Sequence, residues 1–191
     1  EFDDVTEIGG GKYNDATGLP GAHTDYAVVA DPEGTEVNQA YLSYAGVPDT
    51  GLKFGRQRII YDNARFIGNV GWRQNEQTFD GFTVNNTSLS DTTLNYAYIY
   101  NVNRIFGEDS PKGDIDTDTH LDAPAGSNKT LGLRLTGEPA LGESSNLVYA
   151  LEYAQQSDYA DGQNIGADYQ LAELGIKVSG VQLLGGYELL G

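Results

Sequence analysis

Cysteine and methionine are absent from the 191 residues, and histidine occurs only at His23 and His120. Without cysteine the chain can form neither disulfides nor thiolate metal sites. Both histidines lie in polar segments that we expect to be loops, so a histidine-based catalytic or metal site is not expected. The missing methionine and the lack of a signal-peptide pattern indicate a processed chain or a fragment of a longer one.

Long apolar runs are missing too, and basic residues are scarce. No run approaches the roughly 18 apolar residues of a transmembrane helix, which excludes helical membrane proteins and leaves β-barrels open. Eleven Lys and Arg residues oppose 28 Asp and Glu residues, for a formal net charge of −17. Proteins that bind nucleic acid need a basic surface, so we expect no nucleic-acid partner.

Apolar and polar residues instead alternate with a period of two, and helical periodicity does not recur. Leu94, Tyr96 and Tyr98, for example, are separated by Asn95 and Ala97. Such alternation predicts strands with one apolar face and one polar or small-residue face. About nine strands are expected, over residues 2–8, 36–45, 52–62, 73–86, 94–103, 131–135, 147–154, 168–179 and 181–189.

The connections between these strands are of two kinds. Short turns are expected at residues 46–51, 89–92, 138–146 and 179–180, and longer polar segments at 9–35, 63–72, 106–129 and 157–167. Alternating short and long connections are typical of outer-membrane barrels, with short periplasmic turns and long external loops. Tyrosines within the strands fit aromatic girdles, although tyrosine is also a good strand former. We therefore predict an all-β fold, an antiparallel transmembrane β-barrel, as a single domain over residues 1–191.

A series of motifs resembles those of the alginate-export-type outer-membrane porins of Gram-negative bacteria. It comprises EVNQAYLSY (36–44), KFGRQRI (53–59), RFIGNVGWRQNEQTFDG (65–81), LNYAYIYNVNRIFG (94–107), LGLRLTG (131–137) and LVYALEYAQQSDYAD (147–161). The resemblance implies a barrel of roughly 18 strands in the cell outer membrane, in contact with lipid and lipopolysaccharide. It also implies passage of an anionic saccharide, such as an alginate-like polyuronate.

Since about nine strands are fewer than the family barrel has, we expect this chain to be incomplete. Further strands are expected before Glu1 and after Gly191. We also expect a hairpin to be missing near Leu121–Asp122, where the family pattern would descend one strand and return along another.

Four of the six arginines lie within residues 54–73. The candidates for lining the lumen are Arg56, Arg58, Arg65 and Arg73, together with Arg134 on the polar side of its own strand. Guanidinium groups there would form an electropositive constriction that selects an anionic solute. Alternatively, they pair with Asp62, Glu76, Asp80 or Glu152 and brace the barrel wall. Both interpretations stay open, because partly neutralised arginines can still line a pore.

Acidic residues alternate at Asp114, Asp116 and Asp118. An EF-hand loop would need Gly and Glu where this chain has Thr119 and Ala125, so that motif is absent. A looser structural Ca²⁺ site in an external loop and a solvated acidic loop both remain open, and no other cofactor is expected.

The sequence thus predicts a porin that conducts an anionic or saccharide solute by diffusion and has no enzymatic activity. Two other classes stay open. One is a soluble secreted β-sandwich or jelly roll that binds or cleaves polysaccharide. The other is a structural surface protein that assembles through strand edges. The solute, the direction of transport and the oligomeric state are left undetermined by the residues.

Overall fold

The computed structural model describes residues 1–20, 23–61, 64, 67–116, 128–158 and 166–191. Within these ranges the chain forms twelve β-strands and no helix. Accordingly, no helix in the described part of the chain is long and apolar enough to cross a membrane.

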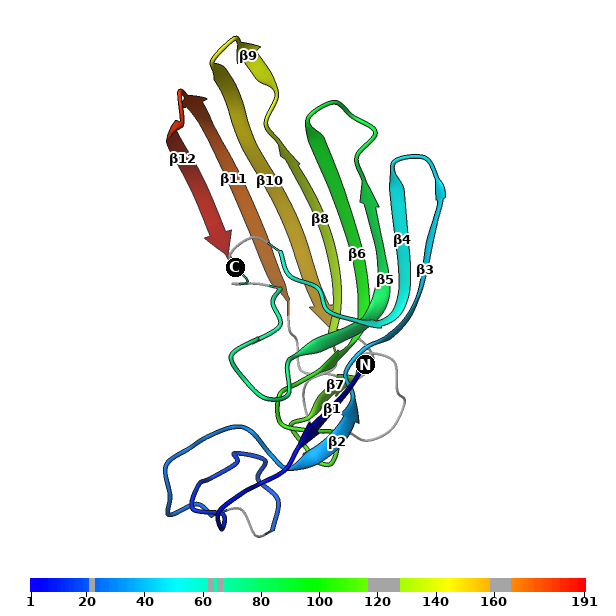
Figure 1. Ribbon diagram of the computed structural model, residues 1–191, viewed down its shortest axis with the longest axis vertical. Helices are drawn as coiled ribbons and strands as arrows, with labels where there is room; N and C mark the ends of the chain where they lie inside the picture. Colours follow the sequence, from blue (N-terminus) through cyan, green and yellow to red (C-terminus); the bar gives the residue numbers. More distant parts are fainter. Residues whose placement is uncertain (21–22, 62–63, 65–66, 117–127, 159–165) are drawn as a thin grey trace. The chain divides into compact units, whose positions relative to one another are not determined.

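The strands form one main sheet and one short ribbon (Figure 1). The ribbon pairs β1 (Phe2–Val5) with β2 (Gly34–Val37) in antiparallel register. The main sheet has the strand order β12-β11-β10-β8-β6-β5-β4-β3, with β7 paired to β6 and β9 paired to β10. Its strands are β3 (Ala40–Val47), β4 (Thr50–Gln57), β5 (Thr78–Asn86), β6 (Thr92–Asn103), β7 (Asp114–Asp116), β8 (Asn128–Gly137), β9 (Ala140–Gly142), β10 (Ser145–Asp158), β11 (Ala167–Val178) and β12 (Val181–Leu190). This antiparallel meander confirms the predicted all-β class, and β3 and β12 are the edges of the described sheet.

Three expected strands have different bounds in the structure. The strand expected at 36–45 is divided into β2 and β3, because the chain leaves the ribbon at Asn38, whose side chain is buried. The strand expected at 52–62 ends at Gln57, and the one expected to open at Arg73 begins only at Thr78. Residues 69–77 instead fold back on themselves, with the Gln77 amide donating to the Asn69 carbonyl at 2.7 Å. Sequence alternation alone did not reveal this local loop.

The chain divides into two compact units. Unit 1 comprises Glu1–Tyr41, Phe54–Gly81 and Tyr100–Ser127, and unit 2 comprises Leu42–Lys53, Phe82–Ile99 and Asn128–Gly191. Strands β3 to β6 contribute residues to both units, so the units are not separate segments of sequence. The single-domain assignment of residues 1–191 stays a prediction.

Unit 2 has an apolar face whose rows follow the strand register. One row joins Leu94, Leu135 and Leu151, and the next joins Tyr96, Leu133 and Tyr153. Paired residues of antiparallel strands lie on the same face, so these side chains form one continuous surface. Leu133 is 49 % exposed and Leu151 is 48 % exposed, although both lie in inner strands of the sheet.

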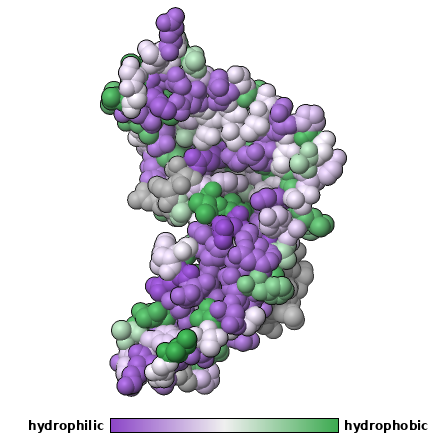
Figure 2. Space-filling model, in the orientation of Figure 1, coloured by the Kyte–Doolittle hydropathy of each residue, from purple (hydrophilic) through white to green (hydrophobic). Residues whose placement is uncertain are grey.

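The opposite face of unit 2 carries mostly short and polar side chains, with the buried Ile99, Tyr169 and Leu171 among them. Its rows contain Ala97, Gly132 and Ala154, and then Asn95, Arg134 and Glu152. Ala97 and Ala154 are fully buried, whereas Leu133 and Leu151 of the other face are exposed. The face turned to the viewer in Figure 2 is largely hydrophilic over these strands. Unit 2 therefore leaves large apolar side chains exposed on one face, in strands where a soluble protein would usually cover them.

Turn chemistry agrees with the predicted short connections. Ser179 and Gly180 both have positive φ (49° and 86°) between β11 and β12, as a two-residue type I′ hairpin requires.

Gly55 in β4 has φ of 121°, and a Cβ there would lie 2.5 Å from the Ala40 carbonyl oxygen. Only glycine allows strand β3 to approach that closely.

Candidate functional site

Arg56 joins three separate segments of unit 1. Its Nε donates to Asp80 Oδ1 on β5 at 3.1 Å, and its Nη1 donates to Glu108 Oε1 at 2.9 Å. The same Nη1 donates to the Val37 carbonyl of β2 at 3.0 Å. With its side chain 21 % exposed, Arg56 fixes a strand, the segment after β6 and the end of the ribbon together.

Carboxylates gather around this arginine. Asp80 also accepts from Asn101 Nδ2 at 3.1 Å, and the Glu108 amide donates to Glu36 Oε1 at 2.8 Å. Burial raises the pKa of Glu36, and the nearby Glu108 and Asp114 carboxylates raise it further. The hydrogen bond from the Glu108 amide lowers this pKa but does not offset the other effects. The surroundings of Arg56 are therefore strongly negative, and the neighbouring carboxylates offset its charge.

Arg58 lies just beyond the end of β4 and binds one carboxylate. Its Nε donates to Glu76 Oε2 at 2.7 Å, and Asn38 and Asn69 donate to the same carboxylate at 3.0 and 2.6 Å. The Glu76 side chain is 8 % exposed, whereas that of Arg58 is 44 % exposed. Burial works to raise the pKa of Glu76, but the hydrogen bonds from Arg58, Asn69 and Asn38 outweigh it and lower that pKa. The buried carboxylate thus holds an exposed guanidinium in place.

Arg73 pairs with Asp31, which was not among the predicted partners. Its Nη1 lies 3.7 Å from Asp31 Oδ2, and the Gln74 amide donates to Asp31 Oδ1 at 3.0 Å. Since Arg73 belongs to the local loop rather than to β5, its position is set by this loop.

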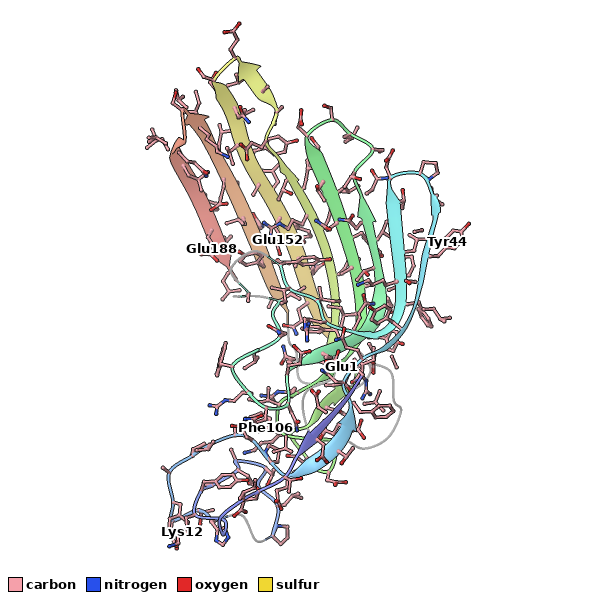
Figure 3. All side chains as sticks on the ribbon, viewed as in Figure 1. Glu1, Lys12, Tyr44, Phe106, Glu152 and Glu188 are labelled. Carbon is pink, nitrogen blue, oxygen red and sulfur yellow. The ribbon has the colours of Figure 1, made fainter. Side chains whose placement is uncertain are left out.

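In unit 2, Arg134 on β8 lies opposite Glu152 on β10. Their closest atoms are 3.5 Å apart, and the two side chains are 12 % and 4 % exposed. In the same unit the Tyr169 hydroxyl donates to Glu188 Oε1 at 3.1 Å. Figure 3 labels Glu152 and Glu188 on the polar face of the sheet.

The structure brings Arg56 to Asp80, Arg58 to Glu76 and Arg134 to Glu152. Asp62, Arg65 and Asp118 lie outside the described residues. Four residues of these clusters were missed. Asp31 and Glu108 pair with arginines, and Asn38 and Asn69 donate to Glu76. In the sequence these residues are marked only by their polarity and by their place in connecting segments. Their separation from the arginines along the chain does not predict the contacts.

The predicted calcium residues lie partly in β7. Asp114 and Asp116 stand opposite Asn103 and Asn101 of β6. Across the part of the chain that the structure describes, no three acidic or histidine side chains are grouped as metal ligands. The looser calcium site, which includes Asp118, stays a prediction.

Comparison with known proteins identifies the first half of the chain. Residues 12–99 match the family model described as alginate export. This segment is similar to the alginate export family. The match confirms the resemblance seen in the motifs and, with it, the location in the outer membrane of a Gram-negative bacterium. The alginate-export segment contains Arg56, Arg58, Arg73, Glu76 and Asp80, whereas Arg134 and Glu152 lie beyond it.

Two solved structures are similar to the chain. OccD3 (OpdP) of Pseudomonas aeruginosa is 17 % identical, with 83 % of this chain and 44 % of that chain covered and a TM-score of 0.44. OccAB2 of Acinetobacter baumannii is 15 % identical, with 75 % and 43 % covered and a TM-score of 0.44. This chain thus spans less than half the length of either protein. Among curated proteins, none matches the chain significantly.

Proposed function

We propose that this chain forms part of the wall of a passive outer-membrane channel, a porin without enzymatic activity. The observation that carries the proposal is the division of unit 2 into an exposed apolar face and a polar face. In water, leucines in the middle of a sheet would be driven into contact with other apolar groups. Against lipid they need no such cover, because the acyl chains are as apolar as they are.

We further propose that the solute is an anionic or saccharide molecule, such as an alginate-like polyuronate. The family description supports this choice, since it names alginate export. A guanidinium carries five N–H donors, and one carboxylate occupies only two of them. Arginines braced by carboxylates therefore remain able to donate to a passing anion. Arg58 has the most exposed side chain of the four described arginine candidates and is the best placed to do so.

The lipid-facing assignment also bears on the soluble alternative. A β-sandwich would cover the apolar face of the main sheet with a second sheet. The described residues contain one other sheet, the β1–β2 ribbon, whose strands are four residues long. We therefore place outer-membrane lipid, with lipopolysaccharide in its outer leaflet, against the face that contains Leu133 and Leu151.

Planar-bilayer recording of the purified protein tests the proposal. We expect stepwise conductance and a reversal potential that shifts toward cation preference when Arg56, Arg58 and Arg134 are all changed to glutamine. Lys12→Gln, which removes one exposed charge in a connecting segment, is the control and should leave the reversal potential unchanged. A protein that stays monomeric and folded without detergent and shows no conductance would refute the channel. Conductance whose selectivity ignores the three arginines would refute their role.

A further inference from the structure

A hollow of about 450 Å³ lies on the polar face of unit 2. Its floor follows one row of the register, in which Thr93, Thr136 and Ala150 stand side by side on β6, β8 and β10. The row continues through Glu173 on β11 to Gly186 on β12. The side chains in the middle of this row, Thr136 and Ala150, are short, and longer side chains around them form the sides of the hollow.

Two ion pairs lie beside the floor. Arg134 pairs with Glu152 in the adjacent row of the register. Towards the turns, Lys177 Nζ lies 2.7 Å from Glu138 Oε1, and Asn146 Nδ2 donates to the same oxygen at 3.1 Å. Within each pair the opposite charges balance, so neither pair adds net charge to the hollow.

Two further carboxylates line the hollow without a cation. Asp91 accepts a hydrogen bond from the neighbouring Ser90 hydroxyl at 3.1 Å. Glu173 pairs with no donor among the described residues, although its side chain is partly buried. A Cβ at Gly186 would lie 3.1 Å from Glu173 Cγ, so the glycine leaves room for this side chain. The hollow therefore carries uncompensated negative charge beside threonine hydroxyls and the Gln182 amide.

We infer that this hollow binds a solute that carries a protonated amine next to hydroxyl groups. The amine pairs with the Glu173 carboxylate, which lacks a cation of its own. The hydroxyl groups exchange hydrogen bonds with Thr93, Thr136 and Gln182. The inference builds on the proposed channel and adds a binding position within it, for a class of solute that the arginines would not select.

Calorimetric titration of the detergent-solubilised protein at about pH 6 tests the site. The probes are glucosamine, which carries the amine, and glucose, which has similar hydroxyls and no charge. We expect glucosamine to bind about tenfold more tightly than glucose, as for a hydrogen bond to a charged group. Glu173→Gln should abolish that preference, whereas Glu143→Gln, on an exposed turn of the same unit, should retain it. Equal binding of the two sugars, or a preference that survives Glu173→Gln, would overturn the inference.

A second variant keeps the test independent of folding effects at Glu173. Gly186→Ala leaves every charge in place but presses on Glu173 Cγ, so it should weaken glucosamine binding and leave glucose binding unchanged. Unchanged glucosamine binding by this variant would count against the site. Bilayer recording separates the two proposals. A conducting protein without glucosamine preference refutes only the site, and a binding protein without conductance refutes only the channel.

Discussion

Unit 1 and unit 2 place polar side chains in opposite ways. Apart from Glu152, the buried polar residues of the described chain all lie in unit 1. They are Thr17, Asn38, Gln57, Asn75, Thr78, Asn103 and Ser110. Unit 2 buries alanines on its polar face and exposes leucines and tyrosines on the other. Unit 1 is thus held by hydrogen bonds between segments, whereas unit 2 depends on an apolar environment for its outer face.

This difference explains why the same residue type has two roles. In unit 1, Arg56 pairs with Glu108 and Arg58 pairs with Glu76, and both carboxylates belong to connecting segments rather than to strands of the sheet. In unit 2, Arg134 and Glu152 lie in adjacent strands already fixed by backbone hydrogen bonds. The ion pairs of unit 1 therefore fix the positions of connecting segments, whereas the Arg134–Glu152 pair of unit 2 sets the charge of the polar face.

The largest expected effect comes from a charge on the apolar face of unit 2. Leu133→Arg should lower the free energy of unfolding by ~2–4 kcal/mol in phospholipid vesicles, because the guanidinium would enter the hydrocarbon layer. Thr136→Arg, on the polar face of the same strand, should change it by less than about 1 kcal/mol. Urea unfolding of both variants measures the difference. Similar losses for the two would mean that the faces do not differ in environment.

A smaller loss is expected where the backbone of unit 1 requires glycine. Gly55→Ala combines a positive φ with a contact to the Ala40 carbonyl and should cost about 2–3 kcal/mol. Gly185→Ala in unit 2 has its nearest contact at 3.9 Å and should stay within about 0.5 kcal/mol of the parent. Chemical denaturation followed by circular dichroism measures both. A harmless alanine at position 55 would contradict the close approach of β3.

The Glu76 cluster tests the hydrogen-bonded character of unit 1. Glu76→Gln removes the charged acceptor of Arg58, Asn38 and Asn69 and should cost about 1–3 kcal/mol. The exposed Arg58 can recover hydration, which keeps the loss below that of a fully buried pair. Glu143→Gln is the matched control and should fall within about 0.5 kcal/mol. Equal stability of the two variants would argue against the cluster.

The smallest effect is a pH dependence of the same cluster. The pKa of Glu76 in the folded protein is lowered from its ordinary value of 4.5. A carboxyl with a lowered folded pKa stabilises the protein above its unfolded pKa, and this contribution is lost as pH falls through the folded pKa. The stability advantage of the parent over Glu76→Gln should therefore be complete at pH 7 and shrink below pH 4.5. An advantage that persists unchanged in strong acid would contradict the assignment.

The strands of unit 2 could be predicted from the sequence because their signal is local. Leu131, Leu133 and Leu135 alternate with Gly132 and Arg134, and a strand places successive side chains on opposite faces. The Ser179–Gly180 turn was equally visible, since few residues adopt two successive positive φ angles. The motifs between residues 36 and 81 carried the resemblance to alginate-export porins for the same reason, as they are contiguous stretches of chain.

The arginine partners could only be predicted in part. Glu76 and Asp80 were named as candidate partners, and they lie 18 and 24 residues from Arg58 and Arg56 in the sequence, whereas Glu108 lies 52 residues from Arg56. Arg73 was assigned to a strand because it precedes an alternating stretch, but hydrogen bonds within residues 69–77 hold it in a loop. Such contacts depend on where separate segments meet, which alternation does not encode.

The sequence by itself determined most of the strands and the two kinds of connection, because successive side chains of a strand point to opposite faces and leave a period of two in the sequence. Only the tertiary structure decided which carboxylates Arg56, Arg58, Arg73 and Arg134 meet, and that Glu173 has no cation beside it among the described residues. Those outcomes follow from strand order and register, which bring together side chains that lie far apart along the chain.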